Sequence, residues 1–169
     1  MPRVVQEFRE FKPRTDFRST VERLLEYVPP EYLVGLDSVV LKDRTAPTKL
    51  RWDRRNASDA EMAACYRRAT KGTKAVIEIY VDVITAGAPG WLMRLAWFRE
   101  AMLARTFFHE IGHHVHRAIA PDGRDPETAA NYWRDKLGRE AMRHRFWFLV
   151  PLRRPLRWYL QVRSRLRRR

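Results

Sequence analysis

The chain has 169 residues, of which 45% are apolar, and its formal net charge is +14. This length and apolar content predict one domain with a single core and exclude the need for a second. The only cysteine, Cys65, excludes an internal disulfide and is expected to be small and buried. Residues 1–18 are rich in charge and lack an apolar core, which excludes a secretory signal peptide and predicts a cytoplasmic location.

The first third of the chain predicts one helix and one strand. A helix is expected over 18–27 and ends before Pro29 and Pro30, and a strand is expected over 38–41. Residues 61–70 are ambiguous between helix and strand. Residues 71–74 have the composition of a turn.

Residues 75–84 alternate between apolar residues at odd positions and the more polar Glu78, Tyr80 and Asp82. This pattern predicts a half-buried strand. The alternation places Tyr80 opposite the apolar face, which argues against a role for its hydroxyl in binding an oxyanion.

A long helix is expected over 91–118, and it contains the HExxH motif His109-Glu110-Ile111-Gly112-His113. Residues four apart lie on one helical face, so His109 and His113 can bind one metal ion. Glu110 lies on the adjacent strip of the helix, within reach of a metal-bound water. Four of the five histidines fall within 109–116, and an apolar stripe runs beside the motif, which together argue against a chance match.

The residues around the motif have separate roles. His114 is rotated about 100° from His113, and His116 lies two turns beyond His109, so both are predicted to be solvated or capping residues. Gly112 is unfavourable in a helix by about 1 kcal/mol, which predicts close approach of a neighbouring strand or helix.

A catalytic zinc needs a third protein ligand. In the metzincin pattern the third ligand is a histidine, which requires Gly at 116 and His at 119. This chain has His116 and Ile119, so the metzincin class is excluded. A second helix is expected over 127–143, with Gly138 as a weak point. Asp125 serves as its cap and Pro126 as its first residue, after a reversal at Pro121 and Gly123. This return predicts Glu127 as the third ligand, with Asn131 one turn later on the same face.

HExxH followed by a helix carrying Glu-x-x-Ala-Asn resembles the gluzincin metallopeptidases, above all the compact minigluzincins and the antirepressor-type peptidases. The resemblance covers roughly residues 74 to 133. It implies that His109, His113 and Glu127 bind one zinc ion, that Glu110 is the general base, and that Asn131 orients a ligand. The interval between His113 and Glu127 is shorter than in the larger gluzincins, so Asp122, Asp125 and Glu140 stay open as alternative third ligands.

The resemblance also implies how a substrate would bind. In the family, the strand before the active-site helix forms the edge of a small sheet above the metal, and a peptide adds to it through backbone hydrogen bonds. In this chain Ile79, Tyr80 and Val81 would then contact the substrate.

The C-terminal residues are strongly basic. Residues 139–169 contain eleven arginines and one acid, Glu140, and residues 146–152 form an apolar run that is too short to span a bilayer. Three interpretations stay open for this segment: packing on the domain, contact with an anionic membrane surface, and binding to nucleic acid.

The sequence therefore predicts an α+β, zincin-like fold in which a small sheet of about three to four strands packs on the active-site helix and the ligand-bearing helix. Residues 1–144 would form the domain and 145–169 a basic amphipathic segment. The predicted function is a zinc metallopeptidase that hydrolyses peptide bonds through a zinc-bound water activated by Glu110. The alternative is a non-catalytic, arginine-tailed protein that binds membrane or nucleic acid, with a structural or vestigial metal site.

Overall fold

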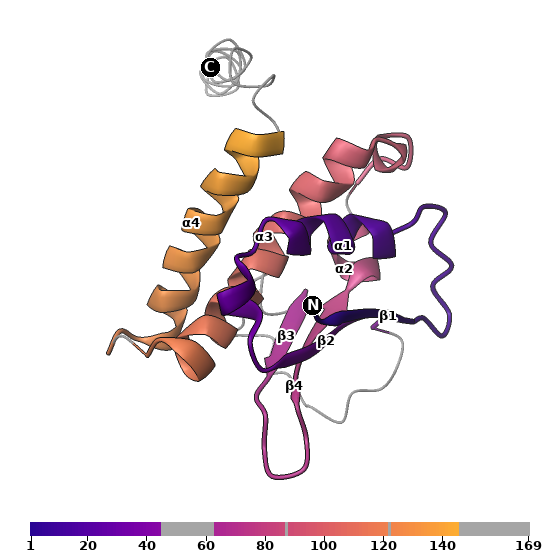
Figure 1. The fold of residues 1–169 in the computed structure, drawn as a ribbon. Coiled ribbons are helices and arrows are strands. Elements are labelled where there is room, and N and C mark those ends of the chain that lie inside the picture. Colours follow the sequence, from indigo (N-terminus) through magenta and orange to yellow (C-terminus); the bar gives the residue numbers. More distant parts are fainter. Residues whose placement is uncertain (45–62, 87, 122, 146–169) are drawn as a thin grey trace, which may run out of the picture. The chain divides into compact units, whose positions relative to one another are not determined.

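The computed structural model describes residues 1–44, 63–86, 88–121 and 123–145. They form an α+β fold with a small four-stranded mixed sheet, as predicted (Figure 1). The strands and helices are β1 (Arg3–Glu7), α1 (Arg18–Glu26), β2 (Leu36–Lys42), β3 (Ala64–Arg67), β4 (Ala75–Tyr80), α2 (Val81–Thr85), α3 (Ala96–His114) and α4 (Pro126–Arg145), with shorter helical segments η1 (Pro30–Leu33), η2 (Leu92–Arg94) and η3 (Val115–Ile119).

The chain divides into two compact units, Met1–Gly138 and Arg139–Arg169. The sheet, α1 to α3 and the first part of α4 belong to the first unit. The predicted basic segment 145–169 lies, apart from Arg145, outside the described residues. Among the described residues, no helix is long and apolar enough to cross a bilayer.

The strand order in the sheet is β1-β2-β4-β3. β1, β2 and β4 run parallel, whereas β3 pairs antiparallel with β4 and forms one edge. The sequence does not predict β1, because it lies in a charge-rich stretch and buries only Val4 of its five residues. It does predict the helix α1 and the turn before β4, and the ambiguous residues 61–70 contain the strand β3.

The core lies between one face of the sheet and the helices α1 and α3, which Figure 1 shows on the same side of the strands. The fully buried apolar side chains at this interface include Val39, Leu41, Ile77 and Ile79 from the sheet, Val21 and Leu24 from α1, and Leu103, Phe107 and Ile111 from α3. Burial of one such side chain stabilises the fold by about 1.5–3 kcal/mol. The core therefore holds α3, which carries the HExxH motif, against the sheet.

The prediction that residues 75–84 form a half-buried edge strand is wrong in three respects. β4 lies between β2 and β3, so both of its backbone edges are hydrogen-bonded. It ends at Tyr80, and Val81 begins the helix α2. Ile79, Tyr80 and Val81 are all buried and are not available to add a substrate strand.

The polar side chains of β4 led to the wrong prediction of a solvent-facing side, because they pair with other side chains instead of facing water. Glu78 is only 4% exposed, and its carboxylate accepts contacts from Lys42 Nζ at 2.8 Å and Arg67 Nη2 at 3.0 Å. The Tyr80 hydroxyl donates to Glu78 Oε2 at 3.3 Å. Burial, together with the Glu78 charge, raises the pKa of Tyr80 to about 12. An alternating sequence pattern shows which residues of a strand are polar, but it does not show whether they are exposed to solvent. In β4 the polar residues Glu78 and Tyr80 are buried.

Candidate metal centre

The helix α3 presents His109 and His113 on one face, as the spacing of four residues predicts. Their ring centroids lie 4.8 Å apart, and the two residues are 4% and 9% exposed. The helix begins later than expected, at Ala96 after the short segment η2, and continues after His114 as the π-helical turn η3. The two imidazoles therefore lie near the C-terminal end of a helix that the core holds in place.

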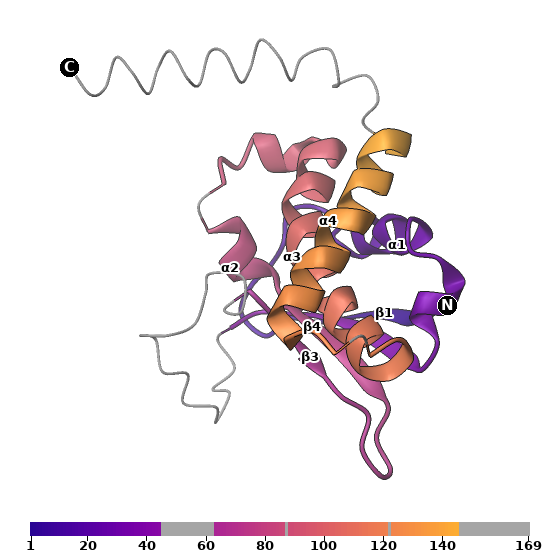
Figure 2. The ribbon, with the colours of Figure 1, turned by 90° about the vertical axis from the view of Figure 1, so that its left-hand side faces the viewer.

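The helix α4 approaches α3 very closely at Gly112, as predicted. A Cβ atom at Gly112 would lie 2.7 Å from both the Cα and the carbonyl oxygen of Ala130, and 3.0 Å from the Cβ of Trp133. Figure 2 shows the two helices side by side. Because Glu127 lies one turn before Ala130 on α4, this contact brings its carboxylate to the histidines.

The start of α4 is stabilised as the sequence indicates. Gly123 adopts a positive φ of 73° in the connection, a conformation that glycine allows without steric cost. The Asp125 carboxylate accepts hydrogen bonds from the backbone N–H groups of Glu127 at 3.2 Å and Thr128 at 3.1 Å. Asp125 is thus the cap of the helix, and Glu127 lies in the first turn.

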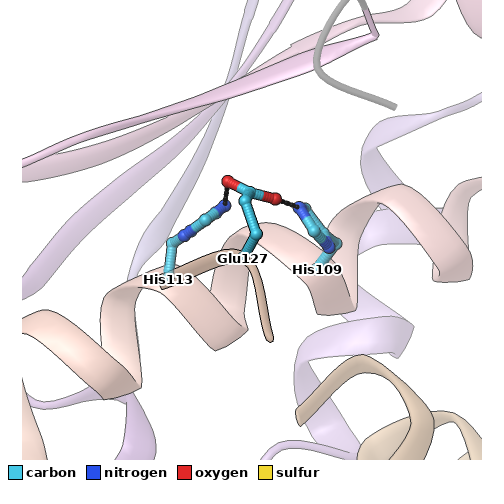
Figure 3. A group of neighbouring side chains, drawn as sticks. All are labelled: His109, His113 and Glu127. Carbon is cyan, nitrogen blue, oxygen red and sulfur yellow. Dashed lines mark ion pairs between the residues drawn. The ribbon is translucent and has the colours of Figure 1, made fainter. Parts of the chain in front are cut away.

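Glu127 reaches both imidazoles (Figure 3). Its Oε2 lies 3.3 Å from His109 Nε2, and its Oε1 lies 3.2 Å from His113 Nε2. A tetrahedral zinc site with ligand bonds of about 2.0–2.1 Å has ligand–ligand separations of about 3.3–3.4 Å. The two observed separations are close to this value but involve different oxygens of Glu127. With one ligand atom taken from each residue, the three atoms lie within 4.8 Å of one another. The group has the donor types and spacing that fit one zinc ion.

The alternative third ligands do not form such a group in the described residues. Asp125 is occupied as the helix cap, and Glu140 belongs to the second unit, Arg139–Arg169. Asp122 lies outside the described residues. Among the described acids, Glu127 is the one that forms a ligand group with His109 and His113.

The electrostatics of the two histidines favour the neutral ring, which is the form that binds metals. Burial, with smaller contributions from the His109 and Arg117 charges, lowers the pKa of His113 to about 4. Burial also lowers the pKa of His109, although the neighbouring Glu127 carboxylate opposes the shift. Within the described residues, both ring nitrogens of His109 and the Nδ1 of His113 are buried without a hydrogen-bond partner. Neutral imidazole nitrogens without a hydrogen-bond partner, next to the Glu127 carboxylate, are suited to binding a cation.

Asn131 lies where the spacing predicts, one turn after Glu127. Its side chain is close enough to His109 to raise the pKa of that ring slightly against the dominant effect of burial. Its Oδ1 accepts a hydrogen bond of 2.7 Å from Arg134 Nη1. Arg134 therefore holds the orientation of the Asn131 amide beside the imidazole.

A pocket of about 230 Å³ opens beside His113. The HExxH residues Glu110 and His113 line it together with Glu127 and Arg117, and the opposite wall consists of Ala64, Cys65 and Tyr66 of β3. Glu110 is only 3% exposed and does not belong to the ligand group. Cys65 is half-buried rather than buried, and this burial raises the pKa of its thiol.

The sequence reasoning missed β3 and Arg117 as parts of this pocket. Residues 64–67 are too few for a clear period-two pattern. Arg117, in contrast, follows His113 by four residues, the same interval that separates the two histidines. That spacing was the signal that could have identified Arg117 as a residue of the same helical face.

The sequence predicts that His114 and His116 are solvated or capping residues, and the first alternative is wrong, because they are 0% and 8% exposed. The His114 Nε2 lies 3.0 Å from the Val34 carbonyl oxygen, which can only accept, so this nitrogen carries the proton. Its Nδ1 is then the acceptor for the Tyr66 hydroxyl at 3.2 Å. His114 thus joins α3 to β3 and holds the wall of the pocket, while neither histidine belongs to the ligand group.

Comparison of the chain with protein families, with curated proteins and with solved structures found no match. The interpretation of the site therefore depends on its own geometry and chemistry.

The lowered pKa of His113 predicts that the metal-free protein loses stability in acid. The folded-state pKa is about 4 against an ordinary value of 6.5, so between these pH values the unfolded chain binds more protons than the folded one. The free energy of unfolding should fall with decreasing pH through this window, by up to about 1.4 kcal/mol per pH unit, and His113 should contribute nothing above it. Urea unfolding of chelator-treated protein at pH 7, 6 and 5 measures the slope.

The matched variant for this measurement is His113→Asn, which removes the titrating ring. Groups away from His113 that titrate in the same window contribute equally to both proteins, so the difference between the two slopes belongs to His113 and the groups in contact with it. Identical slopes would show that His113 does not stay neutral in the folded protein.

Proposed function

We propose that this protein is a zinc-dependent metallopeptidase of the gluzincin type that hydrolyses peptide bonds. The observation that carries the proposal is the Glu127 carboxylate, whose two oxygens lie 3.3 and 3.2 Å from the Nε2 atoms of His109 and His113. The neighbouring Glu110 lines the same pocket. An HExxH helix with a carboxylate from the next helix and an adjacent acid is the set of groups that such hydrolysis requires.

The number of protein ligands favours a catalytic over a structural site. A structural zinc is normally closed by four protein ligands, whereas a catalytic zinc has three and keeps one position for water or substrate. In the part of the chain that the structure describes, the ligand group consists of His109, His113 and Glu127, with no fourth histidine, cysteine or acid. The ligand group also borders an open pocket, which gives a substrate access.

A zinc ion held by His109, His113 and Glu127 would supply a Lewis acid, which lowers the pKa of a water toward neutrality and polarises a carbonyl group. Glu110 accepts the proton of the attacking water and later delivers it to the leaving amine. Its position next to His109 on α3 keeps it beside the ligands. Arg134 holds the Asn131 side chain beside the His109 ring.

The edge of β3 that faces away from β4 is the proposed binding site for the substrate backbone. β4 occupies one edge of β3, and within the described residues no strand pairs with the other edge. Ala64, Cys65 and Tyr66 line the pocket opposite His113. A peptide that adds to this edge in an extended conformation would be held mainly by its backbone. In this proposal β3 would have the role that the family resemblance implied for residues 79–81.

The proposal is tested by metal analysis of the purified protein followed by an assay of unstructured peptides. We expect about one zinc per chain and hydrolysis that a chelator abolishes and added zinc restores. A protein without stoichiometric zinc, or one with zinc and no hydrolysis of any peptide, would contradict the proposal and favour the non-catalytic alternative.

Glu127→Gln is expected to weaken zinc binding by more than about 100-fold, because loss of an outer partner of a ligand alone costs about 10–100-fold. Competition against a chelating indicator measures the affinity. Glu31→Gln, at an exposed position on η1, makes the same change of charge away from the site and should bind zinc as the wild type does. An unchanged affinity in Glu127→Gln would exclude Glu127 as a ligand.

A further inference from the structure

Arg117 lies on the rim of the metal-site pocket. It belongs to the π-helical turn η3 and follows His113 by four residues, so it continues the helical face that carries His109 and His113. The residue is exposed and lines the pocket together with His113, Glu127 and Tyr66. The guanidinium therefore faces both solvent and the space in which a substrate would lie.

The charge of Arg117 acts on groups all around the pocket. Burial dominates the lowered pKa of His113, and the Arg117 charge contributes in the same direction. Burial raises the pKa values of Tyr66 and Cys65, and in both cases the Arg117 charge opposes the shift. These three residues come from α3 on one side and from β3 on the other, so the positive potential of Arg117 extends across the opening.

Several other arginines of the first unit are paired with carboxylates. Arg23 binds the buried Glu100 at 2.6 Å, Arg67 binds Glu78 at 3.0 Å, and Arg134 binds Asp135 at 2.9 Å. Among the described residues, no carboxylate pairs with Arg117. The two acids of the pocket have other roles, because Glu127 contacts the histidines and Glu110 is the proposed base. Within the described part of the chain, no carboxylate takes up the five N–H donors of Arg117, and they can bind a ligand.

We infer that Arg117 binds a carboxylate of the substrate, so that the protein acts on peptides with a carboxylate one or two residues from the scissile bond. The inference rests on the proposed peptidase function and names its substrate class. The planar guanidinium offers two parallel N–H groups that match a carboxylate. The carboxylate belongs either to an aspartate or glutamate side chain or to the C-terminus of a short peptide.

The test compares peptides that differ by one group. One series places Glu, Gln or Lys beside the scissile bond of an otherwise uncharged fluorogenic peptide, and a second series ends the same peptide as a free acid or an amide. We expect kcat/KM to be about tenfold higher for the peptide with the carboxylate, which corresponds to about 1.4 kcal/mol, and the difference should shrink with added salt. The series that shows the preference identifies the source of the carboxylate.

Three variants assign the preference to Arg117. Arg117→Gln should remove it, and Arg117→Glu should reverse it in favour of the Lys peptide. Arg105→Gln makes the same change of charge on α3 at an exposed residue outside the pocket, about 18 Å away along a helix, and should keep the preference. An equal rate for the Glu and Gln peptides and for the acid and amide, or a preference that survives in Arg117→Gln, would overturn the inference.

A binding measurement separates this inference from the proposed function. Fluorescence anisotropy of the labelled acidic and neutral peptides is measured with the Glu110→Gln protein and with the Glu110→Gln/Arg117→Gln double variant. Tighter binding of the acidic peptide that depends on Arg117 supports the carboxylate site even if the wild type hydrolyses nothing. Hydrolysis of all peptides without any charge preference overturns the carboxylate site and leaves the peptidase function standing.

Discussion

Glu110→Gln is expected to lower kcat for peptide hydrolysis by about 10²–10⁴-fold, the range that a positioned general acid or base contributes. The amide has nearly the shape of the carboxylate and cannot accept the proton of the attacking water. Zinc binding should persist, because Glu110 is not a member of the ligand group. The rate with a saturating peptide and the zinc content, measured on one preparation, test both statements.

Glu26→Gln is the matched control for this variant, since Glu26 is exposed at the end of α1 and lies outside the pocket. Its rate should equal that of the wild type. Unchanged turnover in Glu110→Gln would remove Glu110 from the mechanism. Loss of zinc together with activity would instead place Glu110 among the ligands.

Gly112→Ala is expected to weaken zinc binding at least tenfold and to destabilise the protein. The added Cβ would lie 2.7 Å from two backbone atoms of Ala130, so α4 must move away from α3, and Glu127 moves with it. Such overpacking costs about 1–3 kcal/mol and exceeds the roughly 1 kcal/mol that alanine gains over glycine in a helix. Chelator competition and thermal unfolding measure the two effects.

Gly138→Ala is the natural comparison, because Gly138 lies on α4 and a Cβ there meets no atom within 4 Å. This variant should gain up to about 1 kcal/mol of stability from helix propensity and bind zinc as the wild type does. If Gly112→Ala also bound zinc normally, the close approach of α3 and α4 would not be what positions Glu127.

The metal-binding residues could be predicted from the sequence because their arrangement depends on the spacing of residues close together in the chain. An interval of four residues on a helix dictates that His109 and His113 share a face, whatever the helix packs against. The cap at Asp125 and the missing side chain of Gly112 are likewise local properties, and with the reversal at Gly123 they predicted that Glu127 would return to the histidines. The observed separations of 3.3 and 3.2 Å agree with that prediction.

Only the tertiary structure decided which strand borders the pocket. β4 became a central strand because β3, from a segment without clear periodicity, pairs with its outer edge, and pairing partners are not encoded in the period of one strand. In the same way, Glu78 and His114 look solvent-facing as single residues and are buried because Lys42, Arg67, Tyr66 and Val34 satisfy them. A sequence determines which groups a helix or strand presents, whereas burial and edge positions depend on contacts between residues far apart in the chain.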